Sequence, residues 1–354
     1  MINKKQIILH IGQTKTATTS IQNFLHTNQQ QLELSNINYA KRPGRCISHR
    51  YLFHLICASI PKLQGSAFCN KHLTILAKLF RDYQFKTIEE YWQYFKDSLY
   101  KDNCGISLLS EELLWEIGKF EREFKCEMIK VLANKIDQII KPEDITILVA
   151  LRHHAEWIES WHNQMVKDQG NQIKIKPFLE SEIKLGSLDY AKNLNDWRDI
   201  FPKATIKVID FKTSLVTPRP IGIRFLEEAN LIDSLNINSI INFVHPQPLQ
   251  ESIHPFLHAY IIRSQPIIKS LDEYKIKIKQ ANKVITCLVK LMDIDRSYTL
   301  IRPSILEICK ESYANERLKD FGINDLKESI NKKLIVPKVL PKEIVEKLAL
   351  IFKQ

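Results

Sequence analysis

The sequence predicts an α/β protein whose central parallel sheet is flanked by helices, with a helical C-terminal part. Several short runs are apolar throughout rather than alternating, which is typical of strands buried on both faces of a parallel sheet. Helical patterns separate these runs, as right-handed crossovers between parallel strands require. Beyond about residue 250 only helical patterns rich in Lys and Ile remain. We therefore expect a sheet-containing core over residues 1–235 and a helical part, packed on that core, over residues 236–354.

Four strands are expected, and each lies at the start of a strand-to-helix unit. The strands are Ile7–Ile11, a run ending near Ser110 in GISLLSEELL, Ile145–Leu151, and a run in ATIKVIDF (204–211). Helices are expected over 20–32, 71–100, 155–167 and 188–202, whereas 40–70 has no clear period. In the last of these helices Tyr190, Leu194 and Trp197 follow helical spacing, which indicates a stripe packed against the sheet.

Composition narrows the class of protein. The 354 residues carry a formal net charge of +11, which suits an anionic ligand, a nucleic acid or a membrane surface and does not by itself choose among them. The seven Cys are scattered without a C-x-x-C pair, so neither a zinc site nor a disulfide framework is expected. The segment MINKKQIILHI lacks a signal-peptide pattern and no apolar stretch of about 20 residues occurs, so we expect a cytoplasmic protein without a membrane span. No nucleic-acid-binding module is recognisable, and we expect no nucleic-acid partner.

The segment LHIGQTKTATTS connects the first strand to the first helix and is unusually rich in donors. Gln13–Ser20 contains five Thr or Ser hydroxyls and one cation, Lys15. The loop follows the carboxyl end of a parallel strand, where ligands of such sheets bind. A helix beginning near Thr18 or Thr19 would direct N–H groups and a favourable dipole at an anion. Capping of the helix needs only one hydroxyl, so the sequence predicts a phosphate or sulfate site.

A magnesium-dependent nucleotide site fits this loop less well. The P-loop pattern G-x-x-x-x-G-K-[ST] is not met, because Gly12 is followed five positions later by Ala17 and Lys15 precedes the Thr residues. The strand that ends at Leu151 is followed by the cation Arg152, and no acidic strand end that would hold Mg²⁺ is evident. We therefore expect no metal.

Four segments together resemble the sulfotransferases that use 3′-phosphoadenosine-5′-phosphosulfate (PAPS), and the bacterial branch of that family in particular. LHIGQTKTATTSIQNFL resembles the branch's H-I-G-x-x-K-T-G-T-T-S-I-Q loop, which binds the 5′-phosphosulfate. ALRHHAEWIESWHNQ has Arg152 and Ser160 at the spacing with which the family holds the 3′-phosphate. SEELL and LDYAKNLNDWRDIFP resemble the family's S-E-E and L-D-Y-x-x-x-L-x-x-W-x-x-x-F segments. The resemblance covers about residues 5 to 230.

The resemblance implies a P-loop-like sulfotransferase fold and transfer of a sulfonate group from PAPS to a hydroxyl or amine, with the bisphosphate PAP as product. The acceptor would be a small molecule or a carbohydrate. The donor would be held by Gln13, Thr14, Lys15, Thr16, Ala17, Thr18, Thr19, Arg152 and Ser160. Ala17 departs from the family's Gly, and at a positive φ an Ala costs about 1 kcal/mol.

Candidate catalytic residues are Lys15, which would stabilise the leaving phosphate, and a base that takes the acceptor proton. Glu111 is the first candidate for the base, because it follows the second expected strand at the rim that holds the Lys15 loop; Glu112 is the second. His49 is a rival and lies in a loop with three Arg residues that could bind an anionic acceptor, namely Arg42, Arg45 and Arg50. A P-loop-like kinase and a non-catalytic anion-binding relative remain as alternatives.

Overall fold

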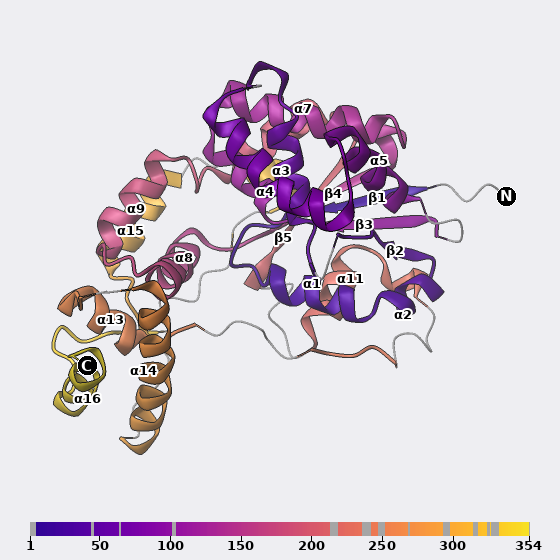
Figure 1. Ribbon diagram of the computed structural model, residues 1–354. Coiled ribbons are helices and arrows are strands. Elements are labelled where there is room, and N and C mark those ends of the chain that lie inside the picture. Colours follow the sequence, from indigo (N-terminus) through magenta and orange to yellow (C-terminus); the bar gives the residue numbers. More distant parts are fainter. Residues whose placement is uncertain are drawn as a thin grey trace. The chain divides into compact units, whose positions relative to one another are not determined.

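The computed structural model describes residues 5–43, 46–63, 65–100, 104–212, 219–235, 242–246, 252–267, 270–292, 298–313, 318–323, 326 and 333–353 (Figure 1). Contacts divide the chain into two compact units. The first comprises Met1–Arg152, Asp189–Leu249 and Glu316–Leu326, and the second His153–Leu188, Gln250–Asn315 and Lys327–Gln354.

The first unit contains a five-stranded sheet in which every strand pair is parallel, and this confirms the predicted α/β class. The strand order is β2-β3-β1-β4-β5. The bounds are Gln6–His10 for β1, Ile37–Tyr39 for β2, Ile106–Ser110 for β3, Ile145–Leu151 for β4 and Thr205–Asp210 for β5. β1 is the middle strand, so the loop that follows it lies between the ends of β3 and β4.

Helices cover both faces of this sheet (Figure 1). One face carries α1 (Thr18–Thr27), α2 (Gln29–Leu34) and α11 (Ile221–Glu228). The other carries α3 (Arg50–Ala58), α4 (Ala67–Tyr83), α5 (Ile88–Leu99) and α7 (Arg122–Asp137), and α10 (Tyr190–Ile200) packs against α7. Short helical segments complete the unit: α6 (Leu113–Glu116), η1 (Pro61–Leu63), η2 (Ile117–Lys119), η3 (Pro142–Asp144), η5 (Ile232–Ser234) and η6 (Leu318–Phe321).

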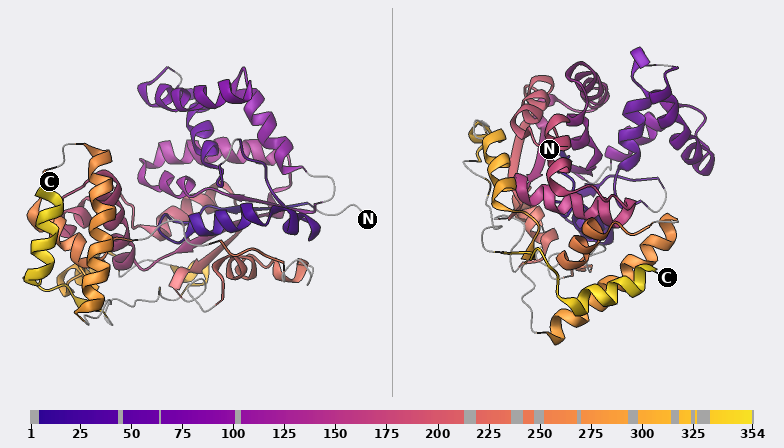
Figure 2. Two further views of the ribbon diagram at one scale, coloured as in Figure 1. Left: turned by 60° about the horizontal axis from the view of Figure 1, so that its bottom comes forward. Right: turned by 90° about the vertical axis from the view of Figure 1, so that its left-hand side faces the viewer.

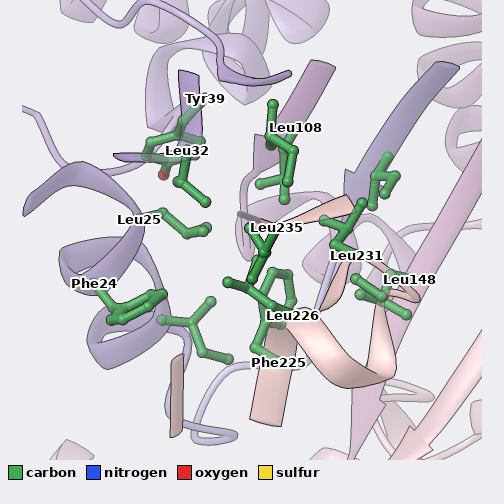
Figure 3. Close-up of a cluster of buried hydrophobic side chains, with 14 of the residues drawn as sticks. Phe24, Leu25, Leu32, Tyr39, Leu108, Leu148, Phe225, Leu226, Leu231 and Leu235 are labelled. Carbon is green, nitrogen blue, oxygen red and sulfur yellow. The ribbon is translucent and has the colours of Figure 1, made fainter. Parts of the chain in front are cut away.

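The core beneath α1, α2 and α11 holds α1 against the sheet (Figure 3). Phe24 and Leu25 of α1 pack with Phe225 and Leu226 of α11 and with side chains of the sheet such as Leu108. Gly222 of α11 allows α1 and α11 to approach closely, because a Cβ at this position would collide with the Phe24 ring. The loop between β1 and α1, which contains Gln13–Ala17, is therefore attached to a helix that is held in place by a closely packed core.

A buried ion pair joins α7 to α10. The Lys125 ammonium contacts the Asp196 carboxylate, and the two side chains are only 3% and 4% exposed. The Arg122 Nε lies 3.5 Å from the other carboxylate oxygen of Asp196, but the Arg122 side chain is 70% exposed. Removal of either charge should destabilise the fold, because the remaining buried charge would have neither water nor its counter-charge to stabilise it.

The second unit is mainly helical. It contains α8 (His154–Gln169), α9 (Ile175–Lys184), α13 (Pro255–Ser264), α14 (Leu271–Leu291), α15 (Pro303–Tyr313) and α16 (Lys342–Lys353). Figure 2 shows the yellow α16 beside the orange α14, with which it shares a core. Two short parallel strands, β6 (Tyr298–Thr299) and β7 (Leu334–Ile335), also occur here, so the expectation of helices alone beyond residue 250 was incomplete.

The units differ from the predicted division after residue 235. Residues 153–188, which carry α8 and α9, belong to the second unit together with the C-terminal helices. Val166 of α8 is part of the same buried cluster as Ile261 of α13, Ile278 of α14 and Ile344 of α16. Among the described residues, no helix is both long and apolar enough to cross a bilayer.

Candidate active site

The loop between β1 and α1 begins in a tightly packed environment. Ile11 continues the β1 ladder, since its N–H donates to the Leu148 carbonyl at 3.0 Å. A Cβ at Gly12 would lie 2.5 Å from the Nε2 of His10, whose ring is fully buried. The absence of a side chain at Gly12 therefore lets the chain turn over the His10 ring at the end of the strand.

The backbone of the loop alternates in the manner of an anion-binding nest. Lys15 has φ 70° and Ala17 has φ 60°, whereas Thr16 between them has no positive φ. Such alternation turns successive N–H groups toward one side, where they form a concave binding site for an anion. Ala17 is also the residue before α1 and offers no side-chain cap to it. The N-terminal N–H groups of α1 and its dipole thus add to the donors of the loop.

Gln13 holds the loop to the neighbouring strand and helix. Its N–H donates to the Ala150 carbonyl at 3.3 Å, and its side-chain amide donates to the Tyr190 hydroxyl at 2.8 Å. The amide oxygen of Gln13 accepts from the N–H of Arg152 at 3.1 Å, and the Tyr190 hydroxyl donates to the Arg152 carbonyl at 3.1 Å. Both polar ends of the buried Gln13 side chain are thereby used within the protein.

Three of the loop hydroxyls donate to acceptors inside the protein. The Thr14 hydroxyl lies 3.2 Å from a Glu116 carboxylate oxygen, and the Thr18 hydroxyl bonds the Glu112 carboxylate. The Thr16 hydroxyl donates to the Gln13 carbonyl at 2.5 Å. Two carboxylates therefore meet the loop hydroxyls from the segment that follows β3, a pairing that sequence reasoning missed. The spacing of Glu112 and Glu116, four residues apart before and within a helix, is the signal that could have indicated it.

Two cations gather at the same loop. Burial raises the pKa of Glu112, and the Lys15 ammonium opposes part of that rise. Arg152 directs its guanidinium toward the loop, with Nη1 3.4 Å from the Lys15 carbonyl, and lies 5.5 Å from the centre of the Phe211 ring. The predicted residues Lys15 and Arg152 thus lie at one edge of the sheet.

Glu111 lies at the end of β3, directly beside β1. Its N–H donates to the His10 carbonyl at 2.9 Å, and one of its carboxylate oxygens accepts from the Leu113 N–H at 2.9 Å. The other oxygen is buried and has no hydrogen-bond partner among the described residues. Burial raises the pKa of Glu111 to about 8, with Glu112 adding to the rise and the Leu113 N–H opposing it. A carboxyl with such a pKa can exchange a proton near neutral pH.

His49 is engaged with the main chain at both ring nitrogens. The Ser110 N–H donates to Nδ1 at 3.1 Å, and Nε2 lies 3.1 Å from the Ala40 carbonyl, which places the ring proton on Nε2. Burial lowers the pKa of His49 to about 3. The ring therefore fastens its loop to the end of β3 in its neutral form, and this geometry favours Glu111 over His49 as the base.

Of the Arg residues predicted around His49, Arg42 is held by groups of its own segment. Arg42 donates to the carbonyls of Ala40 at 2.8 Å and Cys46 at 3.1 Å, and its guanidinium lies 3.9 Å from the centre of the Tyr39 ring. Arg45 lies outside the described residues. Of the predicted cluster, Arg50 has an electrostatic effect on Glu111, where it lowers the pKa of the carboxyl.

The remaining predicted donor-binding residues are Thr19 and Ser160. Thr19 is half-buried in the first turn of α1 and has no side-chain hydrogen bond to the described residues. Ser160 is half-buried in α8 of the second unit, whereas Arg152 belongs to the first. The joint role of Arg152 and Ser160 stays a prediction.

In comparisons with protein-family models, curated proteins and solved structures, nothing matches this chain.

Replacement of Ala17 by Gly is expected to raise the free energy of unfolding by about 0.5–1 kcal/mol. A side chain at φ 60° and ψ 25° is strained, and Gly is also the better residue at a helix N-cap. Chemical denaturation of the two proteins checks this. The matched control is Ala133→Gly in the interior of α7, which should lower stability by about 1 kcal/mol. A loss of stability in Ala17→Gly would show that the loop is not strained at this residue.

Proposed function

We propose that this protein is a PAPS-dependent sulfotransferase, which moves a sulfonate group from the donor to a hydroxyl or amine. One observation carries the proposal. The anion-binding loop that contains Lys15 and the Glu111 carboxyl, whose pKa is raised to about 8, lie at the same edge of the sheet. A group-transfer enzyme with an anionic leaving group needs both a fixed set of donors for that group and a base for the acceptor.

In this proposal the loop N–H groups and Lys15 stabilise the 5′-phosphate as the sulfonate leaves. Arg152 provides a planar fork for the oxygens of the 3′-phosphate, the group that distinguishes PAPS from ATP. Glu111 takes the proton of the acceptor hydroxyl or amine. The hydroxyls of Thr14 and Thr18, which bond carboxylates in the described structure, would exchange these partners for phosphate oxygens when the donor binds.

One observation favours a second candidate, a metal-dependent kinase. The Thr18 hydroxyl at the start of α1 bonds the Glu112 carboxylate, and a helix-start hydroxyl together with a strand-end carboxylate is how nucleotide-binding loops hold Mg²⁺. Glu112, the second candidate for the base, lies two residues beyond the end of β3.

Ligand-induced stabilisation separates the two candidates. We expect PAP in excess chelator to raise the melting temperature by as much as it does without chelator. At about 100 times Kd, a single-site ligand stabilises by about 2.7 kcal/mol. AMP, which lacks the 3′-phosphate, should stabilise far less. A larger shift with ATP and Mg²⁺ than with PAP, abolished by chelator, would favour the kinase.

A further inference from the structure

The second unit contains a cavity of about 250 Å³ that the proposed sulfotransferase site does not use. It is formed where the start of α9, one face of α13, the two-stranded β6-β7 sheet and the start of α15 meet. Cavities that bind small molecules are mostly apolar and carry a few converging polar groups. This cavity follows that description, since its walls are apolar and its charged residues have one sign.

The apolar walls come from four separate segments. They comprise Ile175, Ala259, Ile262, Leu300, Ile335 and Val336. Ala259 and Ile262 lie three residues apart on α13 and so share one face of that helix. Val336 is buried, and the Ile335 side chain remains 44% exposed. An apolar ligand would cover this surface.

Three cations line the same cavity, and the described residues around it include no Asp or Glu; His162 of α8 is its other polar residue. The cations are Lys174, Arg263 and Arg302. The Arg263 Nη1 donates to the Lys338 carbonyl at 2.9 Å, which fixes the direction of that guanidinium. Neither Lys174 nor Arg302 has an ion pair or side-chain hydrogen bond to any described residue.

The two guanidinium groups also repel each other. Arg302 lowers the pKa of Arg263, in addition to the larger lowering by burial. Both residues are exposed, so water screens part of this repulsion, and an oxyanion between the two groups would remove the rest. Arginine suits this task, since its fork matches the oxygens of carboxylate, sulfate and phosphate groups.

We propose that this cavity binds an amphiphilic oxyanion, a carboxylate or sulfate on an apolar chain, with roughly eight non-hydrogen atoms inside the cavity. The size follows from the volume, since a water-sized group occupies about 30 Å³. The oxyanion pairs with Arg302 and Arg263, and the apolar body covers Ile262 and Ile335. The site is independent of the proposed sulfotransferase activity, and it would remain if that proposal failed.

Titration calorimetry of the full chain with octanoate and, separately, octyl sulfate tests the proposal, with octanol and acetate as probes that each lack one half of the ligand. We expect saturable binding of at least one amphiphilic anion below about 1 mM, and binding at least tenfold weaker for octanol and acetate. Arg302→Gln should weaken the anion at least tenfold and leave the weak binding of octanol unchanged.

A matched control removes a positive charge elsewhere in the second unit. Lys283 lines a different cavity together with Lys275 and Lys279, so Lys283→Gln should leave octanoate binding unchanged. The proposal is overturned if neither anion binds saturably, if octanol binds as well as octanoate, or if Lys283→Gln weakens binding as much as Arg302→Gln. A second variant, Ile262→Ser, should weaken octanoate and leave acetate unchanged, and equal effects on the two would also contradict the site.

Discussion

Glu111→Gln is expected to lower the turnover of sulfonate transfer by about 10²–10⁴-fold, with donor binding nearly intact. The amide keeps the shape of the side chain and can still accept from the Leu113 N–H, but it cannot take a proton. Transfer of label from the donor to hydroxyl and amine acceptors measures turnover, and calorimetry with PAP measures binding. Glu123→Gln is the control, because Glu123 is an exposed residue of α7 and should have no effect.

The pH dependence of stability provides an independent check on Glu111. Its pKa rises from 4.5 in the unfolded chain to about 8 in the fold, so the folded state holds a proton that the unfolded state has lost. The contribution of Glu111 to the free energy of unfolding is therefore greatest below about pH 4.5, and it declines as the pH rises toward 8. Glu111→Gln should remove this decline.

Full activity of Glu111→Gln, together with an inactive His49→Ala, would transfer the role of base to His49.

Lys125→Met is expected to lower the free energy of unfolding of the first unit by about 3–5 kcal/mol, the usual cost of breaking a buried ion pair. Among the residues that the structure describes, the substitution leaves the buried Asp196 carboxylate with the exposed Arg122 as its cation, whose Nε is 3.5 Å away. Lys125→Met combined with Asp196→Leu should regain most of the loss, because no uncompensated charge remains. Chemical denaturation, followed by a probe in the first unit, measures both.

An exposed ion pair of similar composition is the control for this prediction. Lys62 and Glu123 lie 3.3 Å apart with side chains 65% and 83% exposed, and Lys62→Met should cost less than about 1 kcal/mol. Equal losses in the free energy of unfolding for Lys62→Met and Lys125→Met would mean that burial does not determine how much the Lys125–Asp196 pair contributes to stability.

The strands illustrate how far sequence reasoning reaches. β4 has the bounds that its apolar run predicts, Ile145–Leu151, and β1, β3 and β5 agree to within one or two residues. β2 was missed because its three residues, Ile37–Tyr39, are too few to show a period. The helix expected over 20–32 is broken at Asn28, whose side chain bonds the Phe24 carbonyl at 2.8 Å and competes with the helical backbone.

The division into units was beyond the reach of the sequence. An amphipathic pattern shows that α8 buries one face, but it does not say which partner covers that face. Val166 packs in the core that contains α13, α14 and α16, which follow α8 by more than 80 residues in the chain. When packing partners are this far apart in the chain, the local sequence pattern of a helix does not reveal which of them it contacts.

The site was predicted in part. The loop, its cation Lys15 and the proximity of Glu111 to β1 follow from the rule that parallel strands bring their carboxyl ends to one edge. The partners of the loop side chains did not follow, because the tie from Gln13 to Tyr190 joins residues 177 positions apart. The burial of His49 was likewise invisible, since it depends on Ala40 and Ser110, which belong to two different strand ends.

The central claim, recognition of a PAPS-type donor, is tested most directly by the binding of PAP and AMP to the unchanged protein and to Arg152→Ala. Arg152 is proposed to contact the 3′-phosphate, and a hydrogen bond to a charged group contributes about 1.5–3 kcal/mol. We predict that Arg152→Ala weakens PAP at least tenfold and leaves AMP nearly unchanged, whereas Lys15→Ala weakens both alike. Equal weakening of PAP and AMP by Arg152→Ala would contradict the account.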